Sequence, residues 1–108
     1  MKLIIGGRAS GKTEFANKEY DGRKIADNIN DLARNLFDSG ISYEKASEHI
    51  IKNYGDCVVI TDEVGNGIVP VDKNERDFRE WIGRVQVLLA KEADEVFRVI
   101  CGIGQRIK

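Results

Sequence analysis

Eight residues near the start of the chain have the order of a phosphate-binding loop. They read Gly-Gly-Arg-Ala-Ser-Gly-Lys-Thr, which matches the pattern GxxxxGK[ST], with an apolar run before and a helical pattern after. Glycines let the backbone curl so that successive N–H groups point at phosphate oxygens, and the following helix adds the positive end of its dipole. The residues predicted to bind a nucleoside triphosphate are Gly6, Gly7, Arg8, Ala9, Ser10, Gly11, Lys12 and Thr13.

A loop of this kind acts with a metal ion and an acidic partner. Lys12 is expected to reach the β- and γ-phosphates of ATP or GTP, and the Thr13 hydroxyl to ligate Mg²⁺. Asp62 and Glu63 follow the most apolar strand pattern, and Asp27 follows a weaker one. Any of these carboxylates is a candidate to hold a metal-bound water or to act as base on an acceptor hydroxyl. The alternative for each is a helix cap or a solvated strand end.

Other polar residues carry weaker signals. Arg76, Arg79 and Arg84 lie on the longest helical pattern, and side chains on the outer face of an amphipathic helix are usually only solvated. From the residues alone we therefore favour solvated charges over a role in phosphate binding. His49 lies in a helix of mixed charge, and we predict a surface or half-buried residue, not a catalyst.

Strand and helix patterns alternate along the chain. Strands are predicted at residues 3–5, 24–27, 57–61 and 96–101, and helices at 11–20, from Asn28 or Asn30 to Ser39, after Ser42 to Gly55, and at 74–92. A loop is predicted around Gly65, Gly67 and Pro70, and a short turning tail from Gly102. This order predicts an α/β protein: a three-layer P-loop NTPase fold with a small, largely parallel sheet, whose ligands bind at the carboxyl ends of the strands.

Composition limits the remaining possibilities. A length of 108 residues suits a single nucleotide-binding domain, residues 1–108. A formal net charge of -1 gives no reason to expect nucleic acid as a partner. No apolar run is long enough for a membrane span and no signal peptide is visible, so we expect a cytoplasmic protein. Cys57 and Cys101 lie in apolar patterns and are expected to be buried, reduced thiols.

The second half of the chain resembles a known family. The segment Glu-Val-Gly-Asn-Gly-Ile-Val-Pro at 63–70, together with the glycine-rich loop, resembles the bifunctional adenosylcobinamide kinase / adenosylcobinamide-phosphate guanylyltransferase family. Residues 76–90 and 93–108 are similar to that family's patterns RxFRDxxGRVNQxLA and ADEVxxVxxGIxxxIK. The resemblance implies a kinase that transfers the γ-phosphoryl of ATP or GTP to a corrinoid, adenosylcobinamide. It also implies site roles for Glu63, Arg79 and Arg84, and a homo-oligomer, a trimer in the family.

The chain also departs from the family pattern. The family carries a histidine that accepts GMP, between its first helix and the segment resembling that around Asp27, and residues 18–30 contain no histidine. The role does not transfer to His49, which lies in a different element, so a shortened form without guanylyl transfer is expected. Asp62 stands where the family has asparagine. Two alternatives stay open: a non-catalytic or regulatory nucleotide-binding module, and a full bifunctional enzyme with a different nucleophile.

Overall fold

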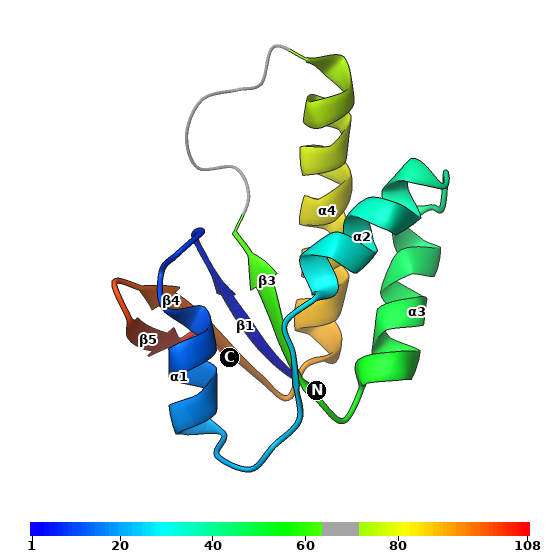
Figure 1. Cartoon of the computed structure of the whole chain (residues 1–108). Helices are drawn as coiled ribbons and strands as arrows, with labels where there is room; N and C mark the ends of the chain where they lie inside the picture. The colour runs from blue at the N-terminus through cyan, green and yellow to red at the C-terminus, as the bar shows by residue number, and fades with distance from the viewer. Residues whose placement is uncertain (64–71) are drawn as a thin grey trace.

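A five-stranded, mostly parallel sheet forms the centre of the molecule, as the computed structural model in Figure 1 shows. The structure describes residues 1–63 and 72–108, so the expected loop at Gly65, Gly67 and Pro70 lies outside the described residues. The strands are β1 (Lys2–Gly6), β2 (Ile25–Ala26), β3 (Val58–Asp62), β4 (Glu95–Ile100) and β5 (Ile103–Arg106), in the order β2-β3-β1-β4-β5. The predicted α/β class and largely parallel sheet are confirmed.

Helices cover both faces of this sheet. The helices are α1 (Lys12–Glu19), α2 (Ile29–Asp38), α3 (Tyr43–Tyr54) and α4 (Lys73–Glu92). Because successive strand residues point to opposite faces, β1 sends Leu3 to one side and Ile4 to the other. An apolar run with no polar alternation is what a strand buried on both faces requires.

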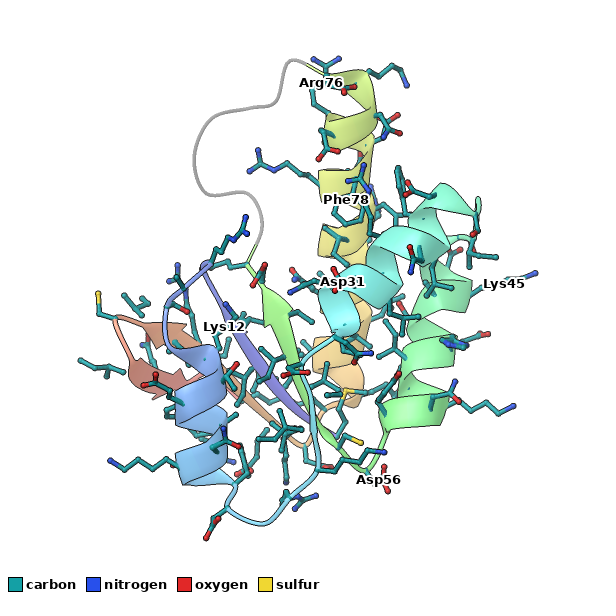
Figure 2. The ribbon with its side chains drawn as sticks, in the orientation of Figure 1. Lys12, Asp31, Lys45, Asp56, Arg76 and Phe78 are labelled. Atoms are coloured by element: carbon teal, nitrogen blue, oxygen red, sulfur yellow. The ribbon has the colours of Figure 1, made fainter. Side chains whose placement is uncertain are left out.

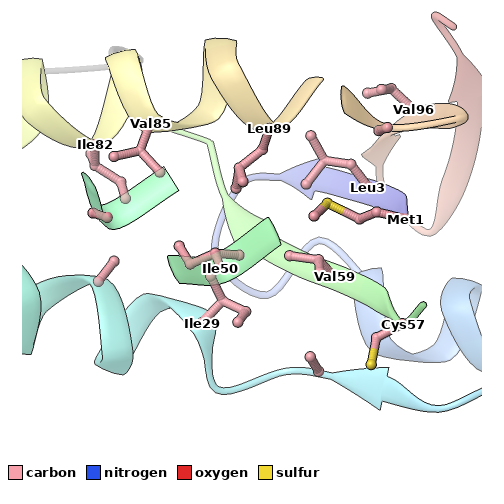
Figure 3. Close-up of a cluster of buried hydrophobic side chains, with 14 residues drawn as sticks. Met1, Leu3, Ile29, Ile50, Cys57, Val59, Ile82, Val85, Leu89 and Val96 are labelled. Carbon is pink, nitrogen blue, oxygen red and sulfur yellow. The ribbon is translucent and has the colours of Figure 1, made fainter. Parts of the chain in front are cut away.

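The larger core lies between the sheet and helices α2, α3 and α4 (Figure 3). Leu3, Val59 and Val96 contribute from three neighbouring strands, and Ile50 and Leu89 from two of the helices. All five side chains are buried. The predicted helix faces therefore pack inward, and this layer holds the strands whose carboxyl ends form the site.

The opposite face is covered by α1, over a smaller core. Ala16 packs there with Ile4 and Val99, and Phe15 stacks obliquely on Phe97 with ring centroids 5.1 Å apart. This packing fixes α1 over β1 and β4, so the loop that joins β1 to α1 must cross the carboxyl edge of the sheet.

Helix ends follow the predicted breaks with one difference. The Ser42 side chain caps α3 by accepting a hydrogen bond from the Lys45 backbone N–H (3.2 Å), and Gly55 ends that helix. Asn28 precedes α2, but its side chain makes no capping bond. Asn30 is the second residue of α2, and its side chain accepts a hydrogen bond from the Asp62 backbone N–H.

The C-terminal segment corrects two predictions. Residues after Gly102 form β5, which pairs antiparallel with β4, and not merely a turning tail. Cys101 lies in the tight turn between these strands with φ 51°, and it is exposed, so the prediction of a buried thiol there is wrong. Cys57 is buried as predicted. The apolar pattern of β4 continues into the turn, where side chains no longer face either core.

None of the helices in the described parts of the chain is both long and apolar enough to cross a membrane.

Candidate functional site

The glycine-rich loop at 6–13 joins β1 to α1 at the carboxyl edge of the sheet (Figure 2). Gly11 has φ 90°, a left-handed conformation that lets the chain turn directly into Lys12, the first residue of α1. The Ser10 backbone N–H donates to the Gly7 carbonyl (3.2 Å), and the Ser10 carbonyl accepts from the Gly102 N–H (2.7 Å). The loop is thus closed on itself and tied to the β4–β5 turn.

Gly6 is a position where this loop has no room for a side chain. A Cβ there would lie 2.6 Å from the Val99 carbonyl oxygen and 2.7 Å from Ser10 Oγ. At Gly7 a Cβ would meet nothing within 4 Å. The close approach of β1 and β4 therefore depends on Gly6, and the loop starts from a backbone position with almost no freedom.

Lys12 points back over the loop to the end of β3. Its Nζ donates to the Gly7 carbonyl (2.6 Å) and lies 3.0 Å from Asp62 Oδ1. The Lys12 side chain is only 8% exposed, while that of Asp62 is 42% exposed. A buried ammonium needs such partners, and the carboxylate supplies an anionic oxygen where the glycine-rich loop would be expected to hold a phosphate.

Two amides fix the backbone of Asp62. Asn30 Oδ1 on α2 accepts from the Asp62 N–H (3.1 Å), and Gln86 Nε2 on α4 donates to the Asp62 carbonyl (2.6 Å). Gln86 also donates to Thr61 Oγ1 (3.2 Å). The end of β3 is therefore held from two helices, so the Asp62 side chain projects from a rigid base.

Glu63 faces a different cation, Arg98. The guanidinium Nη2 of Arg98 lies 3.0 Å from Glu63 Oε1 and 3.2 Å from Oε2. Arg98 lies opposite Ile5 in the β1–β4 register, on the same face as Thr61. Sequence reasoning missed this residue. A single arginine within the apolar strand 96–100 was the available signal, because a guanidinium in such a strand needs a partner at the strand end.

A cavity of about 400 Å³ opens beside the loop, between it and the end of β4. Its lining is formed by Gly7, Arg8, Ala9, Ser10, Glu63, Arg98, Val99, Ile100 and Cys101. Ser10 Oγ and Arg98 Nε are buried and lack a hydrogen-bond partner among the described residues. The space and these unpaired polar atoms fit an anionic ligand.

Two other predicted site residues, Asp27 and Arg84, make none of these contacts. Asp27 is exposed after β2, and β3 separates that strand from β1. Arg84 is exposed and pairs with Glu80 (3.1 Å) over the Tyr43 ring, and the hydrogen bond to Glu80 raises the pKa of its guanidinium. Arg79 lies on α4 and is engaged in an interaction of its own. His49 is exposed on α3, as predicted.

The same residues can be judged against Mg²⁺. The described residues contain no cluster of three His, Cys, Asp or Glu side chains that would hold a metal by themselves. Mg²⁺ at phosphate-transfer sites commonly takes one or two protein oxygens and completes its shell with phosphate and water. Asp62, at 42% exposed, and the exposed Thr13 supply oxygens of the right kind next to Lys12.

Fold and site together define an α/β protein with a glycine-rich loop and paired charges at the carboxyl edge of a mostly parallel sheet. The model of the family described as cobinamide kinase / cobinamide phosphate guanyltransferase matches residues 27–107, and the chain belongs to this family. The resemblance identified from the sequence is therefore confirmed. The matched residues begin after the glycine-rich loop.

Curated relatives agree with this assignment. Over 51 residues, 47% of the chain, it is 53% identical to the bifunctional adenosylcobalamin biosynthesis protein CobU of Salmonella typhimurium. Over an equal length it is 51% identical to the protein of the same name from Escherichia coli. The match spans 28% of the length of each relative.

Proposed function

We propose that residues 1–108 form a single P-loop nucleotide-binding domain that transfers the γ-phosphoryl group of ATP or GTP to adenosylcobinamide. The observation that carries this proposal is the position of Lys12. Its side chain is buried against the loop, and Nζ contacts the Gly7 carbonyl and the carboxylate of Asp62. An ammonium held at the start of a helix, behind a turn of glycines, has the arrangement that binds phosphate.

Phosphate oxygens would replace Asp62 as the anionic partner of Lys12. The ammonium then neutralises charge on the bridging and terminal phosphates, and the loop N–H groups hold those phosphates in place. Bound Mg²⁺, held through Thr13 and Asp62, would supply further charge neutralisation. Glu63 lies one residue beyond β3 and would orient the acceptor hydroxyl and accept its proton. Catalysis on this proposal is positioning plus electrostatic stabilisation.

Family membership supports the corrinoid acceptor. The family description names cobinamide as the group that is phosphorylated and cobinamide phosphate as the guanylyl acceptor. We propose the kinase activity, and not the guanylyl transfer, because the glycine-rich loop and Lys12 are suited to binding the phosphates of a nucleotide. His49, exposed on α3 beside Asn53, is given no part in guanylyl transfer. A homo-oligomer, expected as a trimer from the resemblance, remains a prediction for sedimentation analysis.

Lys12→Ala tests the proposal, with Lys2→Ala as the matched control. Lys2 lies at the opposite end of β1 and pairs with Glu95 (3.3 Å). Binding of ATP and GTP is measured by calorimetry, and products from adenosylcobinamide are separated by chromatography. We expect Lys12→Ala to lose phosphorylation by about 100-fold or more, and Lys2→Ala to retain it. Unchanged nucleotide affinity and turnover in Lys12→Ala would show that the assignment is wrong.

A further inference from the structure

Arg98 is an unusual residue for the place it occupies. It lies within β4, next to the central strand, between Phe97 and Val99, which both pack in the α1-side core. Its side chain points to the other face and is 37% exposed. Burying part of a guanidinium is unfavourable unless its donors are paired. The Glu63 carboxylate uses Nη2, while Nε is buried with no partner in the described residues.

The arrangement around Arg98 repeats that around Lys12. Each cation lies at the carboxyl edge of the sheet, beside the loop, and each contacts one carboxylate from consecutive residues at the end of β3. Lys12 contacts Asp62, and Arg98 contacts Glu63. Each of these two cations is matched by one carboxylate when no ligand is bound, and a multiply charged anion can displace both carboxylates.

Arg98 faces a cavity that lies next to the glycine-rich loop. It is bounded on one side by residues 7–10 of the loop and on the other by Arg98 and the end of β4. Its volume of about 400 Å³ is ample for a phosphate group and its water. A planar guanidinium binds phosphate oxygens through two parallel N–H bonds, which a rearranged Arg98 can offer once Glu63 is displaced.

We propose that Arg98 is a second phosphate-binding cation, which contacts the terminal phosphate of the bound nucleoside triphosphate. Glu63 is its counter-ion when that phosphate is absent. This inference rests on the proposed function, because it requires that the loop bind a nucleotide. The family pattern ADEVxxVxxGI leaves position 98 open.

The test compares nucleotides that differ only in the terminal phosphate. Binding of GTP and of GDP with Mg²⁺ is measured in the absence of adenosylcobinamide, for the wild type and for Arg98→Gln. Binding of adenosylcobinamide phosphate to the same two proteins is measured separately. Arg106→Gln is the matched control, because Arg106 is 59% exposed and pairs with Glu95 (3.4 Å). We expect Arg98→Gln to weaken GTP about tenfold or more and GDP by less than about threefold, since only the triphosphate carries the contacted group.

The complementary variant is Glu63→Gln, which leaves Arg98 intact. Removing the competing carboxylate should tighten GTP binding by about threefold or more, and the double variant Glu63→Gln/Arg98→Gln should lose that gain. Where Arg98→Gln folds poorly, as judged by circular dichroism, the Glu63→Gln variant still tests the proposal, because it leaves Arg98 in place. Arg98→Lys keeps the positive charge but lacks the two parallel N–H donors of the guanidinium. It should therefore bind GTP more tightly than Arg98→Gln and less tightly than the wild type.

Each remaining outcome has a definite meaning. Equal weakening of GTP and GDP, or no change in either with unchanged affinity for adenosylcobinamide phosphate, would overturn the proposal. Loss of adenosylcobinamide phosphate affinity alone would overturn the proposal, because it would assign Arg98 to the phosphate of the product and not to that of the nucleotide. A wild-type protein that binds neither nucleotide refutes the proposed function itself. A wild type that binds GTP through Lys12, with Arg98→Gln unaffected, refutes only the role of Arg98.

Discussion

Charged side chains lie at both ends of the parallel strands. The two groups differ in whether buried polar atoms near them lack hydrogen-bond partners. At the amino end, Lys2 and Arg106 both pair with Glu95, which also accepts a hydrogen bond from the Tyr20 hydroxyl (2.9 Å). At the carboxyl end, Lys12 and Arg98 each pair with a separate carboxylate beside a cavity. Buried polar atoms without partners, among the described residues, occur only at the carboxyl end.

This difference separates structural charge from charge available to a ligand. The amino-end network joins β1, β4, β5 and the end of α1 around one carboxylate, that of Glu95. Its hydrogen bonds from Tyr20 and Lys2 lower the pKa of Glu95, which is the sign of a carboxylate stabilised in its ionised form. At the carboxyl end, the Arg98–Glu63 pair lines a cavity that a stronger anion can enter. Variants at the two ends should therefore affect different measurements.

The largest effect is expected where the backbone leaves no room. In Gly6→Ala the new Cβ would overlap the Val99 carbonyl, so β1 and β4 must separate at the start of the loop. We expect a loss of about 1–3 kcal/mol in the free energy of unfolding and loss of measurable nucleotide binding. Urea unfolding and calorimetry measure the two effects.

Gly7→Ala is the control for this change. A Cβ at Gly7 has nothing within 4 Å, so the unfolding free energy should stay within about 0.5 kcal/mol of the wild type. If Gly6→Ala were as stable and as able to bind nucleotide as Gly7→Ala, the close contact of β1 and β4 would have no functional meaning.

Asp62→Asn should produce an effect of intermediate size: tighter binding of nucleotide and a lower free energy of unfolding. The carboxylate that pairs with Lys12 would repel an incoming phosphate, so its removal should tighten Mg²⁺-free ATP or GTP by about tenfold. Because Asp62 is half exposed, the loss in unfolding free energy should not exceed about 1 kcal/mol. Asp94→Asn, at the amino end, should leave nucleotide affinity unchanged. Weaker nucleotide binding by Asp62→Asn without metal would contradict this reading of the pair.

Much of the carboxyl edge could be predicted from the chain alone. Continuous apolar runs at 3–5 and 57–61 predict strands buried on both faces, and such strands are parallel and end at one edge. The glycine-rich loop and Asp62 follow those runs directly, so their proximity follows from chain order. Asp62 lies against Lys12, whereas Asp27 lies beyond the outer side of β3.

Other contacts depend on which strands are neighbours and how they are paired, and the sequence of one segment does not show this. The pairing of Arg98 with Glu63 needs β4 beside β1 and not at an edge, and 35 positions separate the two residues. Strand β5 was missed because its residues, Ile-Gly-Gln-Arg, have little strand character without β4 to pair with. Cys101 was misassigned because an apolar run does not show where its strand ends and a turn begins.

The two cysteines lie at opposite ends of the sheet and should differ in their rates of alkylation, a smaller effect than those above. Burial raises the pKa of the Cys57 thiol, with a further contribution from its hydrogen bond to Asp56, so this thiol should resist iodoacetamide until the protein unfolds. Cys101 is exposed and lines the carboxyl-end cavity, so it should react in the folded protein. Bound nucleotide should slow that reaction, as peptide mass spectrometry will show. Equal labelling of both thiols would contradict the described burial.

The smallest effect is expected at the amino end, in Tyr20→Phe. Burial, followed by the hydrogen bond to Glu95, raises the pKa of Tyr20 to about 12, and the same bond lowers the pKa of Glu95. A lowered carboxylate pKa stabilises the fold above the unfolded-state value and loses this contribution as pH falls through the folded-state value. The raised tyrosine pKa stabilises the fold below about 10, its unfolded-state value, and loses this contribution as pH rises through about 12.

Tyr20→Phe should therefore be slightly less stable than the wild type at neutral pH. The part of that difference that comes from Glu95 should disappear in acid, where this carboxyl is protonated in both proteins. Urea unfolding from neutral to acid pH measures the difference, and nucleotide affinity should not change. A stability difference that grew as the pH fell would mean that Glu95 is not the group involved. A change in nucleotide affinity would mean that the amino end also serves the ligand.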